Sequence, residues 1–178
     1  MSYYPLKEKM DSNQLSNDLL KNLIGKSQPV FLCVGSSRCV SDCLGPIVGE
    51  LLIKKYNISA FVYGNMDTNV TVKNIDEFVS FIRKEHPLSP IVLIDSSVGN
   101  EDEVGMVKFC KGGVIPGGYT HQRTQILGDY SLTSIVTTTG TDQLIFLRST
   151  TLKMVWKTSL FIADAISKFL NKAERPLF

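Results

Sequence analysis

Long apolar runs are missing from this 178-residue chain, and none approaches the roughly 18 residues that a membrane-spanning helix needs. The first thirty residues carry charges from Lys7 onward and have no signal-peptide core. We therefore expect a cytoplasmic protein with no membrane partner. The length is typical of one domain, and we expect a single α/β domain over residues 1–178, with a helical extension at 1–29 and the core at 30–172.

A strong charge of one sign is also missing. Nineteen Lys and Arg against seventeen Asp and Glu give a net charge of +2, and the basic residues are scattered along the chain. This pattern argues against a nucleic-acid partner. The four cysteines have no zinc-finger spacing with the two histidines, so they are expected to be free thiols in a reducing compartment. The alternative for Cys39 and Cys43 is a metal site or a redox pair.

The familiar nucleotide and hydrolase motifs are absent too. Gly35, Gly45 and Gly49 do not have the spacing of a dinucleotide fingerprint, and no phosphate-binding P-loop follows them. The serines of the same segment lack the Gly-x-Ser-x-Gly context of a nucleophile elbow, which disfavours a serine hydrolase.

Apolar runs predict five strands: Val30 to Val34, Ser59 to Tyr63, Ile91 to Ile94, Val104 to Phe109 and Leu132 to Thr137. Apolar side chains at helical spacing predict helices around residues 15–24, 47–52, 75–82 and 152–169, the last with Trp156 on its inner face. The first three strands alternate with helices and should be parallel, whereas the fourth follows a short connection and should be antiparallel. The prediction is an α/β fold with a mixed, mostly parallel sheet.

Two acidic residues follow predicted strands. Asp42 lies in the loop after the first strand, just before a helix, and Asp95 ends the third strand. Ligand sites of open α/β sheets form beyond the carboxyl ends of the strands, so the two carboxylates are expected to face one another. The alternative for Asp42 is a helix N-cap, and for Asp95 a cap on the following turn.

Two neighbouring carboxylates cannot both ionise cheaply, so such a pair can share one proton, activate water and protonate a leaving group without any cofactor. The same oxygens, together with a histidine, could instead hold a divalent metal. The residues leave both alternatives open. The irregular stretch from Gly112 to Asp129 is a candidate substrate-binding segment or lid, or else a mobile surface loop.

The segment from Val34 to Pro46, with its Asp-x-Leu-Gly-Pro core, resembles the first motif of the YyaC sporulation proteins of spore-forming bacteria. The core is also similar to that of the spore germination protease, an aspartic-type endopeptidase that acts on small acid-soluble spore proteins, and more distantly to that of hydrogenase maturation peptidases. The stretch from Ile91 to Asp95 resembles the strand that ends in the germination protease's second catalytic aspartate. Leu127 to Leu132 resembles a later YyaC motif.

This resemblance implies a three-layer α/β/α sandwich of the phosphorylase/hydrolase type, with Asp42 and Asp95 as catalytic residues. We expect the neighbouring loop to contact substrate through Ser36, Ser37, Arg38, Ser41 and Gly45. His121 has roughly the order in the chain of the histidine that joins two acids around a metal in hydrogenase maturation peptidases, so it is a candidate metal ligand, or else a loop histidine. Two departures are that Ser36-Ser37 stands where relatives more often carry Thr-Asp, and that the chain is much shorter than the germination protease.

The expected function is that of a sporulation-associated endopeptidase, or a helper of one, that cuts small acid-soluble spore proteins in the cytoplasm of the mother cell or forespore. No cofactor is required in this reading, although a divalent metal is compatible with it. The alternative is a non-catalytic spore-associated protein that keeps the peptidase fold and binds a partner protein.

Overall fold

The computed structural model describes residues 1–5, 11–117, 125–140 and 150–174. Its centre is a six-stranded sheet with the strand order β1-β5-β6-β4-β2-β3. The strands are β1 (Ser2–Tyr4), β2 (Val30–Cys33), β3 (Phe61–Tyr63), β4 (Ile91–Gly99), β5 (Val107–Lys111) and β6 (Tyr130–Thr138). The helices are α1 (Asn13–Leu23), α2 (Leu44–Glu50), α3 (Ile75–Glu85) and α5 (Leu152–Ala173).

Four of the strands form the parallel part of the sheet. β2 pairs with β3 on one side and with β4 on the other, and β4 pairs with β6, all in parallel. All four residues of β2 are buried, as expected for a strand that has both faces covered. Cys33 pairs with Ile94, so β2 ends level with the middle of the longer strand β4.

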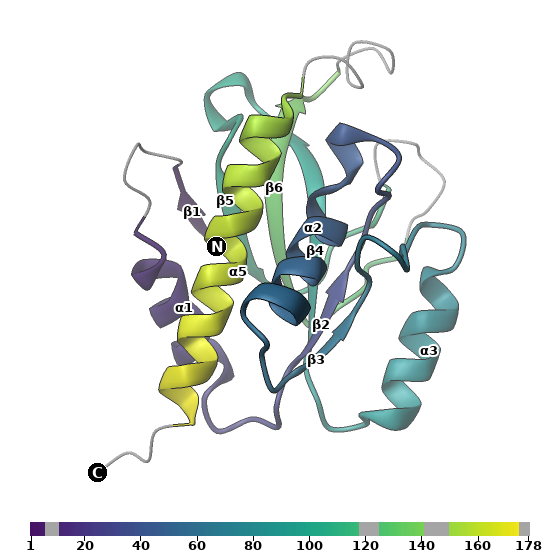
Figure 1. Cartoon of the computed structure of the whole chain (residues 1–178), viewed down its shortest axis with the longest axis vertical. Coiled ribbons are helices and arrows are strands. Elements are labelled where there is room, and N and C mark those ends of the chain that lie inside the picture. The colour runs from purple at the N-terminus through teal and green to yellow at the C-terminus, as the bar shows by residue number, and fades with distance from the viewer. Residues whose placement is uncertain (6–10, 118–124, 141–149, 175–178) are drawn as a thin grey trace.

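Helices cover both faces of this sheet (Figure 1). Side chains of α1, α2 and α5 pack with Phe31 and Ile94 in the larger hydrophobic core. Side chains of α3 pack with Leu32 and Leu93 in a second core on the opposite face. Because successive side chains of a strand point to opposite faces, the unbroken apolar runs of β2 and β4 supply both cores. The molecule is therefore a three-layer α/β/α sandwich with a mixed sheet, as predicted.

The other side of the sheet is antiparallel. β5 pairs with β6, which confirms the antiparallel direction predicted for this segment, and β1 pairs with β5 at the edge. Only a helical extension was predicted over residues 1–29, with no strand before Val30. The N-terminal residues Ser2–Tyr4 nevertheless extend the sheet, and Tyr4 is 4% exposed.

The final helix lies along one face of the sheet, as predicted, but two of its residues were assigned wrongly. Val155, Phe169 and the residues on the same stripe are buried, whereas Leu152 and Trp156 are 58% and 47% exposed. Residues 152 and 156 are one turn apart on the solvent side of the helix, so the prediction of Trp156 as a core residue was wrong. In the described ranges no helix, α5 included, is long and apolar enough to cross a membrane.

Candidate active site

Asp42 lies in a tight loop that connects β2 to α2. The loop ends in the single 3-10 turn η1 (Val40–Asp42), and the N–H of Ser36 donates to the carbonyl oxygen of Asp42 over 2.8 Å. Gly35 has a φ of +134°, and a Cβ at this position would lie 2.1 Å from that same carbonyl oxygen. Only glycine allows the chain to close on itself here.

The Gly-Pro pair after Asp42 fixes the start of α2 against the end of β2. A Cβ on Gly45 would lie 2.0 Å from the carbonyl oxygen of Val34, so helix and strand touch backbone to backbone. Leu44 is fully buried in the larger core. The Asp-x-Leu-Gly-Pro sequence therefore has a packing reason: the glycine permits the close approach, and the leucine anchors the helix start that carries the aspartate.

Asp95 comes to the same place from β4. It follows Ile94, the partner of Cys33 at the end of β2, and is paired in register with Thr133 of β6. The residue is 5% exposed, and its Oδ1 accepts a hydrogen bond from the N–H of Ser96 over 2.8 Å. Asp95 is the fifth of the nine residues of β4, so the prediction that it ends the strand was wrong. The turn η1 packs against β4, and the negative charge of Asp42 acts on Asp95, so the two residues lie near each other.

Burial raises the pKa of both carboxyls. For Asp42 burial raises the pKa to about 6, against the opposing effect of a backbone hydrogen bond from Ser36. For Asp95 burial raises the pKa well above its usual range, the negative charge of Asp42 raises it further, and the hydrogen bond from Ser96 opposes both. A carboxyl that serves only as a cap accepts hydrogen bonds that lower its pKa, so neither residue behaves as a simple cap. Both carboxyls therefore hold their protons to a higher pH than an ordinary aspartate does.

The predicted substrate-contacting residues divide into two groups. Ser37 and Arg38 are exposed and Ser36 is partly exposed, so their side chains are accessible beside Asp42. Ser41 and Gly45 are buried, and the hydroxyl of Ser41 lies 3.0 Å from Sγ of Cys39. The structure gives these two a packing role, and contact of any of the five with a substrate stays a prediction.

Asn69 supports the loop that carries Asp42, a role that was not predicted from the sequence. Its Oδ1 accepts hydrogen bonds from the N–H and the hydroxyl of Ser37, at 2.9 and 3.0 Å. The neighbouring Val70 carbonyl accepts the N–H of Gly35 over 2.7 Å. The segment after β3 therefore braces the loop that carries Asp42. A signal was present in the three asparagines Asn65, Asn69 and Asn74, a residue type that hydrogen-bonds to nearby backbone in loops.

The described residues do not assemble a metal centre. Within them, no three side chains of His, Cys, Asp or Glu gather as metal ligands. The candidate ligand His121 lies outside the described residues, as does the central part of the Gly112 to Asp129 loop. Cys39 and Cys43, on either side of Asp42, are both free thiols, and burial raises the pKa of Cys43.

The model of the family described as "Protein of unknown function (DUF1256)" matches residues 3–167, which include both aspartates. The chain belongs to this family. It is 27% identical over 139 residues to the "Uncharacterized protein YyaC" of Bacillus subtilis (strain 168), an alignment that covers 78% of this chain and 67% of that protein. The resemblance to YyaC that the motifs indicated is thereby confirmed.

A similar solved structure is the crystal structure of a [NiFe] hydrogenase maturation protease HycI from Thermococcus kodakarensis KOD1. The two share 16% sequence identity with a TM-score of 0.49, over 84% of this chain and 98% of that one.

Proposed function

We propose that the protein is a peptidase in which Asp42 and Asp95 share one proton and activate water on a peptide bond. The observation that carries the proposal is their electrostatic coupling: the charge of Asp42 raises the pKa of a carboxyl that is already buried. Titratable groups whose pKa values are shifted by burial and by a specific charged neighbour are typical of active sites. The pair also lies where the strand β2 ends, which is the usual ligand edge of a parallel α/β sheet.

The two environments suggest different roles for the carboxyls. With a pKa of about 6, Asp42 is ionised at neutral pH and takes a proton from the attacking water. The oxygen of that water forms a bond to the carbonyl carbon of the peptide, while Asp95, still protonated, gives its proton to the carbonyl oxygen. When the tetrahedral intermediate collapses, the C–N bond breaks, Asp42 gives its proton to the leaving amine, and Asp95 recovers its own from the hydroxyl that becomes a carbonyl. The products are an acid and an amine.

The proposed substrates are small acid-soluble spore proteins, and this choice rests on the resemblance of the first motif to that of the spore germination protease. The proposed site of action is the cytoplasm of a sporulating cell for the same reason. Ser37 and Arg38, which are exposed beside Asp42, are the side chains proposed to contact the substrate chain.

The test is to incubate the purified protein with small acid-soluble spore proteins, with and without added divalent metal, and to identify products by mass spectrometry. Discrete products that are lost in Asp42→Asn and retained in Asp67→Asn support the proposal, because Asp67 is an exposed carboxylate with 80% of its side-chain surface accessible. No cleavage under any condition, or equal cleavage by Asp42→Asn, contradicts it.

One observation favours the alternative of a binding protein that keeps the fold. Asp95 is only 5% exposed, which leaves little of its carboxyl open to a substrate. In this case the protein binds a spore protein without cutting it, and Asp95→Asn leaves that binding unchanged. Pull-down of the spore proteins with the wild-type and variant proteins, followed by mass measurement of the bound chain, separates the two functions.

A further inference from the structure

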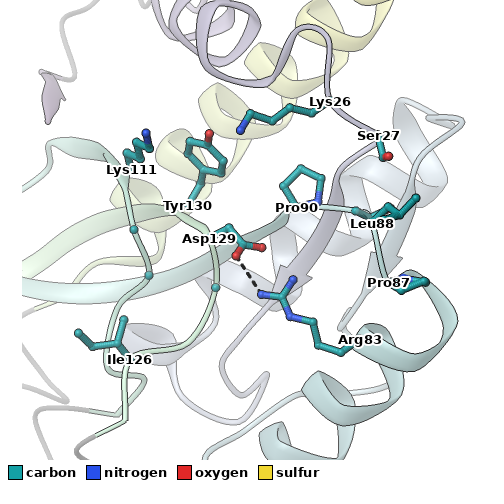
Figure 2. Close-up of a pocket in the computed structure, with 14 residues that line it drawn as sticks. Lys26, Ser27, Arg83, Pro87, Leu88, Pro90, Lys111, Ile126, Asp129 and Tyr130 are labelled. Carbon is teal, nitrogen blue, oxygen red and sulfur yellow. Dashed lines mark hydrogen bonds and ion pairs between the residues drawn. The ribbon is translucent and has the colours of Figure 1, made fainter.

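A pocket of about 900 Å³ opens at the end of the sheet where the parallel strands begin, whereas Asp42 follows the end of β2 and Asp95 lies in the middle of β4. Its wall is formed where β4 and β6 begin, and where β5 and α3 end (Figure 2). Among the described residues that line it, three carry basic side chains, Lys26, Arg83 and Lys111, and one, Asp129, carries a carboxylate. These lining residues have a net charge of +2, which equals the net charge of the whole chain.

Asp129 is held in place in the pocket by two contacts. Its Oδ1 lies 3.0 Å from a guanidinium nitrogen of Arg83, and its Oδ2 accepts the N–H of Ile91 over 2.7 Å. Burial alone would raise the pKa of Asp129, but the hydrogen bonds from Arg83 and Ile91 and the charges of Arg83 and Lys26 lower it. The carboxylate is therefore ionised and neutralises Arg83, which it holds at the pocket wall (Figure 2).

The two lysines keep their charge available. Among the described residues neither Lys26 nor Lys111 forms a salt bridge, and both are exposed. The ammonium group of Lys26 lies 5.6 Å from the centroid of the Tyr130 ring, which itself stacks on Phe109. The Tyr130 hydroxyl donates to the carbonyl oxygen of Asn22 over 3.0 Å. The stacking on Phe109 and this hydrogen bond together hold the tyrosine ring in place beneath the lysine.

Apolar side chains stand beside the charges. Leu88 is 81% exposed and Ile126 is 64% exposed, two of the largest values among the apolar side chains of the described chain. A small inorganic anion would pair with the lysines and leave both side chains in water. A segment of polypeptide with acidic and apolar residues can pair with the lysines and also cover Leu88 and Ile126. Exposed apolar side chains surrounded by charges are typical of docking sites for proteins.

We propose that this pocket docks an acidic peptide segment of a partner protein, whose carboxylates pair with Lys26 and Lys111 and whose apolar side chains cover Leu88 and Ile126. The inference is independent of the proposed peptidase activity, because neither Asp42 nor Asp95 lines the pocket. Binding here leaves Asp42 and Asp95 uncovered.

The test uses a fluorescein-labelled peptide of Asp and Glu residues around two leucines, titrated with the full-length protein by fluorescence anisotropy. We expect Lys26→Gln with Lys111→Gln to weaken binding about fivefold, because each of the two exposed charge pairs that are lost contributes about a two- to threefold change. Lys153→Gln with Lys157→Gln removes the same charge from exposed positions on α5 and should change the affinity less than about twofold. Leu88→Ala should weaken binding without changing its dependence on salt.

The substituted side chains are exposed, so the variants should keep the wild-type circular dichroism spectrum and melting temperature. Equal losses in the two double-lysine variants would overturn the proposal. So would displacement of the peptide by inorganic phosphate where chloride of equal ionic strength does not displace it, since the pocket would then be a small-anion site. Asp42→Asn should bind the peptide like the wild type, which keeps this test separate from that of the peptidase.

Discussion

Burial raises the pKa of Asp95 in β4, and the negative charge of Asp42 in the turn η1 raises it further; burial raises the pKa of Asp42 as well. The two residues are more than fifty positions apart in the sequence and meet because β2 and β4 are neighbours in the sheet. Such a pair makes stability depend on pH, since a carboxyl whose pKa is raised in the folded state opposes ionisation on folding. In the proposed peptidase the same pair also sets the pH dependence of turnover.

Activity should follow the ionisation of the pair. Turnover rises through pH 6 as Asp42 loses its proton and falls again at higher pH as Asp95 loses its own. The measurement is kcat/KM for a peptide that spans the identified cleavage site, determined across the pH range in which the protein stays folded. In Asp42→Asn the remaining activity should be lower by about 10²–10⁴-fold and should have lost its rising limb. A flat profile in the wild type would argue against the shared proton.

Stability should fall as pH rises through the pKa values of the pair. An unfolded aspartate has a pKa of about 3.9, so below that pH both states are protonated, and above it folding opposes ionisation of the buried carboxyls. For Asp42, a folded pKa of about 6 corresponds to a loss of about 3 kcal/mol at most between pH 4 and pH 8. Asp42→Asn should therefore gain stability relative to the wild type as pH rises.

Urea unfolding of both proteins at pH 4 and pH 8 gives the comparison. The difference between variant and wild type isolates this residue from the carboxyls whose pKa values are lowered, such as Asp129 and Asp164. A difference that stays constant between the two pH values would show that Asp42 titrates normally.

The close contact at Gly45 predicts a large effect of a single methyl group. Gly45→Ala places a Cβ 2.0 Å from the carbonyl oxygen of Val34, well inside van der Waals contact, and should lower the free energy of unfolding by more than about 3 kcal/mol. Gly25→Ala is the matched control. Gly25 has a φ of +75° and no heavy atom within 4 Å of an added Cβ, so only the cost of about 1–2 kcal/mol for a left-handed residue applies. Similar losses in urea unfolding of the two variants would contradict the packing described here.

The ionised state of Asp129 predicts a loss of stability on its neutralisation. Asp129→Asn weakens the contact with Arg83 and the hydrogen bond from the Ile91 N–H, and should cost about 1 kcal/mol near neutral pH, because the ion pair is partly exposed. The cost should fall as the pH drops through the lowered pKa of Asp129. Asp67→Asn, in an exposed contact of 3.7 Å with Lys54, should change stability by less than about 0.5 kcal/mol.

Much of the fold could be predicted because its signals are local. The apolar runs of β2 and of the first four residues of β4 predict strands with both faces covered, and the helix between them predicts parallel pairing. The continuation of β4 through polar residues to Gly99 has no such signal. The meeting of Asp42 and Asp95 then follows from topology alone. By contrast, β1 has only three residues, and it is a strand because it pairs with β5 about a hundred positions later. No periodicity in three residues can indicate that.

Side-chain direction and charge clustering depended on tertiary structure. Helical spacing assigned Trp156 to the inner face of the last helix together with Val155, but only Val155 faces the sheet, and Trp156, one position later, lies toward solvent. The basic residues are scattered in the sequence, yet Lys26, Arg83 and Lys111 reach one pocket from three separate segments. Asn69 likewise contacts Ser37 only because the segment after β3 folds back beside the site.

The most direct test of the aspartate pair is to follow the carboxyl ¹³C chemical shifts of Asp42 and Asp95 against pH by NMR, in the wild type and in Asp42→Asn. We expect Asp42 to titrate near pH 6 and Asp95 well above its usual range, and we expect the pKa of Asp95 to fall in the variant because a neighbouring negative charge is gone. Titration of both carboxyls near pH 4, or a pKa of Asp95 that is the same in the two proteins, would contradict it.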